Sequence, residues 1–334
     1  MESFFLYYEL YRLIYFKTNT FFMNGGFTMT VLKTTNLTKK FGGFTALDGI
    51  DLELNKGEVF GFIGPNGAGK STTIRILLGI LKATEGTVEI FGMDAWEDAV
   101  EIHKRIAYVP GDVNLWPNLT GGEVIDLFVK LRGANHENRR AELIQKFDLD
   151  PTKKCRTYSK GNRQKVALIA AFSSEADLYI LDEPTSGLDP LMEQVFQQCV
   201  MDVKNAGKSV LLSSHILSEV EKLCDRVGII RQGKIIETGT LRELQHLTRT
   251  NLLVETKQPI TLLKEITGVY DIKEQNQALS FQVESEALDT VMKHISQFGI
   301  VKLESAPPTL EDLFMGYYEG SSEGTEETGV GGAS

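Results

Sequence analysis

The segment Gly64 to Ser71, GPNGAGKS, constrains the fold more than any other part of the chain. It fits the pattern Gly-x-x-x-x-Gly-Lys-Ser/Thr, follows an apolar run at 58–63 and precedes a segment of helical periodicity at 70–81. A strand that passes through a glycine-rich turn into a helix directs backbone N–H groups and the helix N-terminus at one anion. The pattern therefore predicts a phosphate-binding loop in an α/β fold.

A second motif, LYILDEP at Leu178 to Pro184, predicts a buried strand followed by two carboxylates. Asp182 would lie at the carboxyl end of the strand and hold Mg²⁺, directly or through water, together with Ser71. Glu183 would polarise an attacking water, and a positioned base of this kind is worth roughly 10²–10⁴ in rate. A simple helix N-cap after a core strand explains the motif less well, because the polar turn SGLDP follows it.

The glycine-rich loop is expected to make most of the contacts with a nucleotide. Lys70 would neutralise the β- and γ-phosphates. The expected phosphate-contacting residues of the loop are Gly64, Pro65, Asn66, Gly67, Ala68, Gly69, Lys70, Ser71 and Thr72.

Two polar motifs complete the set, YSKGNRQK at Tyr158 to Lys165 and SSH at Ser213 to His215. The first is a glycine-containing turn before a helix, which makes sense if it caps a nucleotide held by a second copy of the chain. His215 follows a predicted strand, where it would hydrogen-bond a γ-phosphate and orient the water of Glu183. The other four histidines have no motif around them and are expected to be ordinary surface or packing residues.

With these motifs in this order, residues 31–245 resemble the ATP-binding subunit of an ABC transporter. In that family Gly64 to Ser71 corresponds to the Walker A motif, Leu178 to Glu183 to Walker B, Ser186 to Pro190 to the D-loop and His215 to the switch histidine. Phe41 resembles the aromatic residue that stacks on adenine, and the alternative is a core phenylalanine. The resemblance implies ATP and Mg²⁺ as cofactors, and a head-to-tail homodimer in which Ser159 and Gly161 of one copy reach the γ-phosphate on the other. It also implies ATP hydrolysis that powers a separate transmembrane permease, and a peripheral location on the cytoplasmic face of the cell membrane.

The chain departs from the family pattern in two places. The signature motif reads YSKGN, with Lys160 and Asn162 in place of glycine and glutamine. This variant resembles the branch that exports drugs and natural products, which favours export of a drug-like or other small molecule. Gly111 stands where the family has a glutamine that contacts Mg²⁺ and the permease, and Asp112 or Asn114 are the candidate substitutes.

Composition excludes some other classes. Much of the net charge of −10 lies after residue 248, and no basic stripe is present, which argues against nucleic-acid binding. No run of about 18 apolar residues predicts a transmembrane span. The three cysteines show no metal-binding or redox spacing.

ABC-type ATPases of DNA repair carry a long coiled-coil insertion, and those of translation carry two ATPase cores. Neither feature is visible in this sequence. A regulatory ATPase stays open as an alternative.

The pattern of elements predicts a P-loop α/β core with a helical signature subdomain and an antiparallel β subdomain. Strands are expected at 31–37, 46–54, 58–63, 86–91, 106–109, 178–182, 209–213, 226–231 and 234–237. Helices are expected at 70–81, 120–131, 140–147, 161–174, 190–205 and 216–223, with a further helix that starts at Thr240. Thr120 with Glu123, and Thr240 with Glu243, fit capping boxes, and Asp189-Pro190 fits an N-cap before a first-turn proline. Exposed Leu115 and Trp116 would suit a permease helix, although packing within the helical subdomain explains them equally well.

The predicted domains are a leader at 1–29, an ATP-binding domain at 30–247, a small α+β accessory domain at 248–318 and a disordered tail at 319–334. In the accessory domain, strands are expected at 252–255, 269–273, 279–283 and 300–304, and helices at 260–266, 288–298 and 309–318. The aromatic-rich leader reads either as a membrane-surface anchor or, as we favour, as a translated ribosome-binding site before a natural start at Met29.

Overall fold

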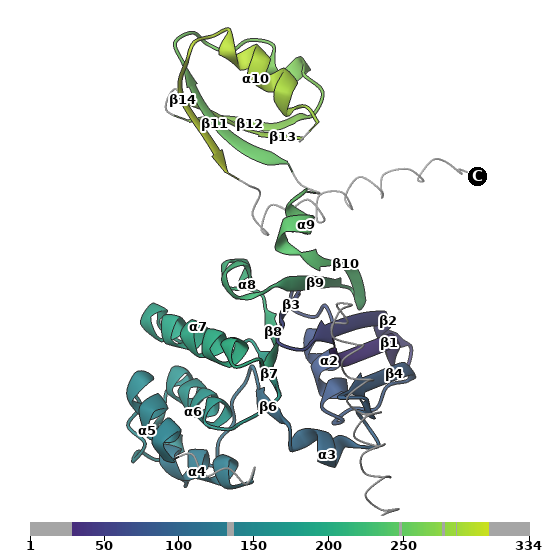
Figure 1. Ribbon diagram of the computed structural model, residues 1–334, viewed down its shortest axis with the longest axis vertical. Coiled ribbons are helices and arrows are strands. Elements are labelled where there is room, and N and C mark those ends of the chain that lie inside the picture. Colours follow the sequence, from purple (N-terminus) through teal and green to yellow (C-terminus); the bar gives the residue numbers. More distant parts are fainter. Residues whose placement is uncertain (1–28, 132–136, 247–248, 276–277, 285, 307–334) are drawn as a thin grey trace, which may run out of the picture.

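A computed structural model describes residues 29–131, 137–246, 249–275, 278–284 and 286–306 of the 334-residue chain (Figure 1). The predictions for the leader, the disordered tail and a terminal helix at 309–318 fall outside these residues.

A six-stranded sheet forms the centre of the fold, with the strand order β10-β9-β3-β8-β7-β6. All neighbours pair in parallel except β9 and β10, which form an antiparallel hairpin. The strands are β3 (Val59–Ile63), β6 (Ile106–Val109), β7 (Leu178–Asp182), β8 (Ser209–Ser214), β9 (Arg226–Arg231) and β10 (Lys234–Thr240). Every residue of β3, β7 and β8 is buried, as is typical of parallel strands that are covered on both faces.

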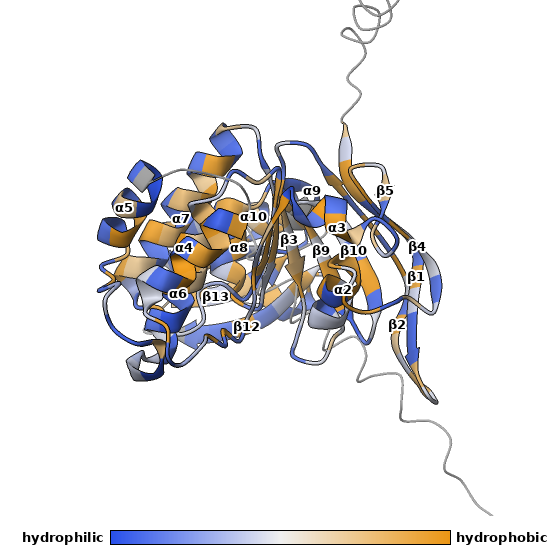
Figure 2. Cartoon of the chain, turned by 90° about the horizontal axis from the view of Figure 1, so that it is seen from below, coloured by the Kyte–Doolittle hydropathy of each residue, from blue (hydrophilic) through white to orange (hydrophobic). Residues whose placement is uncertain are grey.

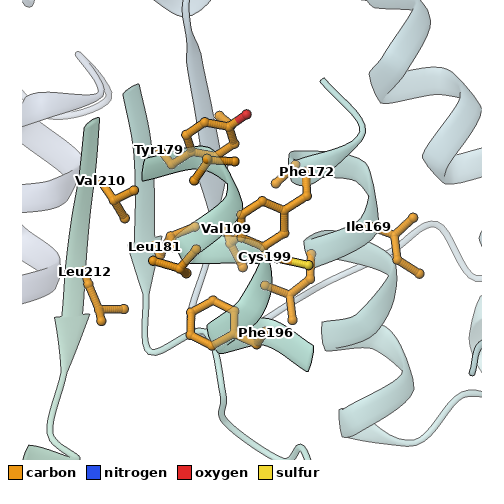
Figure 3. Packing of buried hydrophobic residues seen from close by; sticks show 14 of the residues in the cluster. Val109, Ile169, Phe172, Tyr179, Leu181, Phe196, Cys199, Val210 and Leu212 are labelled. Atoms are coloured by element: carbon orange, nitrogen blue, oxygen red, sulfur yellow. The ribbon is translucent and has the colours of Figure 1, made fainter. Parts of the chain in front are cut away.

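Successive residues of the central strands contribute to two different hydrophobic cores. In β7, Leu178 and Ile180 belong to one core, while Tyr179 and Leu181 belong to the other. Figure 3 shows the second core, where Tyr179 and Leu181 meet Phe172 and Phe196 from two helices. The rings of Phe172 and Tyr179 stack with centroids 5.6 Å apart. This alternation explains why both faces of the sheet must be covered.

A four-stranded antiparallel sheet covers one side, in the order β2-β1-β4-β5, and packs with helix α2. Its strands are β1 (Thr30–Phe41), β2 (Phe44–Asn55), β4 (Glu85–Ile90) and β5 (Met93–Asp94). Helix α2 spans Lys70–Leu77 and the short helix α3 spans Ala99–His103.

Helices cover the other side, as Figure 2 shows with the apolar strands between the two layers. They are α4 (Gly121–Leu131), α5 (Glu137–Lys146), α6 (Lys160–Phe172), α7 (Pro190–Asn205) and α8 (Leu217–Leu223), with a 3₁₀ turn at Cys155–Thr157 and α9 (Leu241–His246) after β10. Both capping boxes are confirmed, since Thr120 and Thr240 each exchange hydrogen bonds with the glutamate three residues later. Asp189 accepts hydrogen bonds from two backbone N–H groups of α7, so this N-cap is confirmed as well.

Several predicted helix boundaries differ from the structure, and two helices differ most. Helix α2 ends at Leu77 rather than at residue 81, because Gly79 takes a left-handed backbone conformation with φ 62°. The predicted helix at 260–266 is reduced to a 3₁₀ turn, Leu263–Glu265. Leu262 before it has φ 61°, a left-handed conformation that interrupts a right-handed helix. Strand β5 and helix α3 were not predicted, because both are too short to give a periodic signal.

The C-terminal unit has its own sheet, in the order β12-β13-β11-β14, and its own core. Its elements are β11 (Thr250–Thr256), β12 (Val269–Gln275), β13 (Ala278–Val283), α10 (Leu288–Ser296) and β14 (Ile300–Ala306). All strand pairs are antiparallel, and α10 packs on one face through Val291 and Ile295. Figure 1 shows this unit at one end of the molecule, beyond α9.

All three cysteines of the chain, Cys155, Cys199 and Cys224, are free thiols with buried side chains. Burial raises the pKa of Cys199 to about 11 and raises that of Cys224 further. Within the described ranges, no helix combines the length and the apolar character needed to cross a membrane.

Candidate functional site

The glycine-rich loop joins the end of β3 to the start of α2, as the sequence predicted. A side chain at position 64 would collide with the carbonyl oxygen of Ile230 on the neighbouring strand. Gly69 has φ 117°, a conformation that L-residues rarely adopt, and it immediately precedes the first residue of α2. The two glycines therefore allow the loop to turn tightly against the sheet and present the N-terminus of α2 to an anion.

Lys70, the first residue of α2, folds back over the loop. Its ammonium donates hydrogen bonds to the carbonyl oxygens of Gly64 (2.6 Å) and Pro65 (3.2 Å), and only 5% of the side chain is exposed. Burial lowers the pKa of Lys70, while the nearby carboxylates of Glu183 and Asp182 oppose that shift. The result is a cation held at the mouth of the loop, where phosphate oxygens would lie.

Asp182 and Ser71 meet across the ends of β7 and the glycine-rich loop. Ser71 Oγ donates to Asp182 Oδ2 over 3.2 Å, and Oδ1 of the same carboxylate is buried without a hydrogen-bond partner among the described residues. Burial raises the pKa of Asp182. A hydroxyl beside a carboxylate with a free oxygen is the donor set that Mg²⁺ prefers, so these residues fit the metal.

Glu183 lies between Lys70 and a histidine. Its Oε1 is 3.8 Å from Lys70 Nζ and 3.3 Å from His215 Nδ1. Glu183 has φ 46°, which turns the chain sharply at the end of β7, and half of the His215 side chain is exposed. The structure therefore brings together the three side chains that the sequence assigned to catalysis.

A cavity of about 160 Å³ opens beside the loop. The loop residues, Phe44, Ala46 and Glu183 line it. Phe41 is half exposed, with the Lys39 ammonium 5.1 Å from its ring centroid, so the alternative of a core phenylalanine is wrong. Phe41 and Phe44 pair across the β1–β2 hairpin. Phe44 was not predicted as part of the site. Its position, separated from Phe41 only by Gly42-Gly43, would have marked it as a candidate.

The signature turn contacts the D-loop of the same chain. Ser159 is the N-cap of α6 and accepts a hydrogen bond from Asn162 N at 3.3 Å. Lys160 Nζ donates to Ser186 Oγ over 2.6 Å. A side chain at position 161 would overlap the carbonyl oxygen of Gly187. Backbone N–H groups at a helix N-terminus favour negative charge, so the start of α6 has the polarity that an anion would need.

Gly111 lies beside the Asp182–Glu183 backbone. A Cβ there would be 3.2 Å from Asp182 O and 3.6 Å from Glu183 Cβ, so the position is close to both carboxylate-bearing residues. Asn114 Nδ2 donates to Asp112 Oδ2 over 3.4 Å, and both side chains are exposed. The two candidate substitutes for a glutamine therefore contact each other.

Comparison with known proteins adds to this geometry. The family model "ABC transporter" matches residues 47–186, and the model "ATP-binding protein DrrA1-3-like, C-terminal domain" matches residues 239–318. The bacitracin transport ATP-binding protein BcrA of Bacillus licheniformis is 32% identical over 313 residues, covering 88% of this chain and 99% of its own. The daunorubicin resistance ATP-binding protein DrrA3 of Streptomyces coeruleorubidus is 33% identical over 301 residues, covering 86% and 95%.

Solved structures show the same fold. An ATP-binding subunit of an ABC transporter superposes with a TM-score of 0.63 at 32% identity, covering 65% of this chain and 93% of its own. A dimeric ATP-binding cassette in a post-hydrolysis state, bound to ADP and Pi, superposes with a TM-score of 0.58 at 27% identity, covering 63% and 99%.

Proposed function

The chain belongs to the ATP-binding subunits of ABC transporters, and we propose that it powers a separate membrane permease that exports a drug-like or other small molecule. The family accounts for ATP binding and hydrolysis. Three points go beyond it: the separate permease, the direction of transport and the role of each residue at the site.

The placement of Glu183 carries the catalytic assignment. Its carboxylate faces Lys70 on one side and His215 on the other, next to the Asp182–Ser71 pair. Lys70 would hold the β- and γ-phosphates, Glu183 would polarise the attacking water and His215 would orient it. Mg²⁺, held by Ser71 and Asp182, would neutralise charge that develops on the phosphate oxygens.

Ser159 and Gly161 would act on the nucleotide of a partner copy. They lie at the N-terminus of α6, on a different surface from Lys70, which suits a head-to-tail dimer that sandwiches two ATP molecules. The similar cassette that was solved as a dimer with ADP and Pi supports this arrangement. Because phosphoryl transfer depends on positioned charge, we expect an open monomer to be nearly inactive.

Export is supported by the relatives and by the signature turn. One relative is named for bacitracin transport and another for daunorubicin resistance, and the matches cover 88% and 86% of this chain. A permease contact is supported by apolar side chains on α4 and the loop before it. Trp116, Phe128 and Leu131 are exposed, and the Trp116 and Phe128 rings lie 6.2 Å apart. A peripheral position on the cytoplasmic face of the membrane follows from such a contact.

The test is ATP hydrolysis in membranes that contain the full chain with or without the permease encoded beside it. Turnover that requires the permease and is lost in Glu183→Gln is the expected result. A Trp116→Ala, Leu131→Ala double variant should keep basal turnover and lose permease stimulation. Turnover indifferent to the permease would instead support the regulatory ATPase.

A further inference from the structure

A buried carboxylate outside the catalytic set, Glu219, lies on α8 with 4% of its surface exposed. Its Oε2 accepts hydrogen bonds from Ser214 Oγ at 2.9 Å and, more weakly, from Thr185 Oγ1 at 3.5 Å. Its Oε1 is buried without a hydrogen-bond partner among the described residues. All three side chains are almost inaccessible to solvent.

The two hydroxyl partners come from the two loops that carry catalytic side chains. Thr185 stands two residues after Glu183, and Ser214 stands directly before His215. Ser214 Oγ also accepts a hydrogen bond from Ile216 N at 3.0 Å, so the switch loop is held on both sides of His215. Glu219 therefore links the segment after β7 to the end of β8.

The same link reaches the signature helix. Gln164 on α6 is buried, and its Nε2 donates to the carbonyl oxygen of Pro184 over 2.9 Å. Pro184 is the residue before Thr185. A short path of buried polar contacts thus runs from α6 through Pro184 and Thr185, just before the D-loop, and through Glu219 to the switch loop.

Glu219 differs from another buried carboxylate of the chain, Glu58. Glu58 is paired with Arg226, 3.1 Å away, and also accepts from Asn55 N. Within the described residues Glu219 has no ion pair, and Glu193 on α7 adds a second negative charge nearby. A buried carboxylate without a cation costs stability, so packing alone does not account for it.

We propose that Glu219 is a positioning residue, which sets the separation of Glu183 and His215 by holding Thr185 and Ser214 against one carboxylate. The proposal rests on the ATPase function of the chain. Because misplacement of a reacting group by about 1 Å can cost about 10²-fold in rate, loosening either loop should reduce kcat more than it reduces ATP binding.

The first test compares Glu219→Leu, which removes the acceptors, with Glu219→Gln, which keeps one. We expect kcat of the leucine variant to fall at least about tenfold with KM for ATP within about twofold, and the glutamine variant to retain most of the activity. Glu58→Gln, at the opposite end of the sheet, is the matched control and should leave kcat near wild type. An unchanged kcat in Glu219→Leu would overturn the proposal.

The second test is a double-mutant cycle with His215→Ala. If Glu219 acts by setting the separation of Glu183 and His215, Glu219→Leu should lower kcat by less than about twofold in the His215→Ala background. An equal loss in both backgrounds would mean that Glu219 supports the fold generally, and would also overturn the proposal. If Glu219→Leu does not fold, Ser214→Ala and Thr185→Val are used in its place, because each removes one hydrogen-bond donor to Glu219. A wild-type protein that does not hydrolyse ATP would count against the ATPase assignment, and not against the contacts that Glu219 makes with Thr185 and Ser214.

Discussion

Oε1 of Glu183 lies 3.3 Å from Nδ1 of His215, although the two residues come from different strands. The strand pairing accounts for this contact. Asp182 is in register with Ser213 on the neighbouring strand, and Glu183 N donates to Ser213 O over 2.8 Å. The hydrogen-bond ladder between β7 and β8 therefore continues up to Glu183, and the loops need only a short extension to bring its side chain to His215.

Replacing Glu183 by glutamine should lower ATP turnover by about 10²–10⁴-fold, because the variant loses the base that polarises water. ATP should stay bound, and the protein should accumulate as a dimer. Phosphate release and size-exclusion chromatography with ATP would measure both effects, with exposed Glu89→Gln as the control. Unchanged turnover together with a monomeric state would contradict the assignment.

Replacing Phe44 by alanine should weaken ATP binding, because Phe44 lines the cavity beside the phosphate loop. Loss of one stacked base costs about 1–3 kcal/mol, which corresponds to roughly 5- to 150-fold in Kd. Phe41→Ala is the paired variant across the hairpin. Titration with a fluorescent ATP analogue gives the Kd of each variant. A larger rise in Kd for Phe41→Ala than for Phe44→Ala would favour Phe41, the residue predicted from the sequence to stack on adenine.

Gly161→Ala should reduce activity strongly, since its Cβ would overlap Gly187 O and push the signature turn away from the D-loop. Gly43→Ala is the control, because a Cβ at position 43 has no atom within 4 Å. Thermal unfolding and ATP turnover of the two variants give the comparison. Equal behaviour of both variants would show that the contact between the two loops is dispensable.

The stability of the protein should fall as pH rises from about 4.5 to about 7, in part because of Glu219. Burial raises the pKa of this carboxyl to about 7, against hydrogen bonds from Ser214 and Thr185 that lower it and the charge of Glu193 that raises it further. Between these two pH values the folded state keeps a proton on Glu219 that the unfolded state has released near pH 4.5. The stabilisation from this proton is therefore fully present below about pH 4.5 and is lost above about pH 7. The change is of the order of 3 kcal/mol. Glu219→Gln should flatten the dependence of Tm on pH between 5 and 8, and a parallel curve for wild type and variant would refute the assignment.

The ATPase core could be predicted in most respects because its elements carry strong local signals. Buried strands such as β3 and β7 are continuous apolar runs, and Asp189-Pro190 marks the start of α7 without ambiguity. The grouping of Lys70, Glu183 and His215 could also be predicted, because each follows a predicted strand, directly or through the glycine-rich turn.

The missed features depend on contacts between distant segments. Nothing near Glu219 in the sequence shows that its carboxylate meets Thr185, which is 34 residues away. The turn at Leu263–Glu265 was predicted as a helix because Ile260, Leu263 and Ile266 have helical spacing, yet they are held by the sheet of the C-terminal unit. Phe41 and Phe44 flank the same two glycines, so the local sequence does not tell which of them lines the cavity. The geometry of the hairpin decides this.

The burial of Cys155, Cys199 and Cys224 has a practical consequence for following the motion of this protein. Maleimide and iodoacetamide dyes react with exposed thiolates, and these three side chains offer neither exposure nor, for Cys199 and Cys224, an ionised thiol near neutral pH. A single cysteine introduced at an exposed site such as Gln145 on α5 can therefore be labelled in the otherwise native chain. Fluorescence from that site would report how the helical layer moves when nucleotide binds.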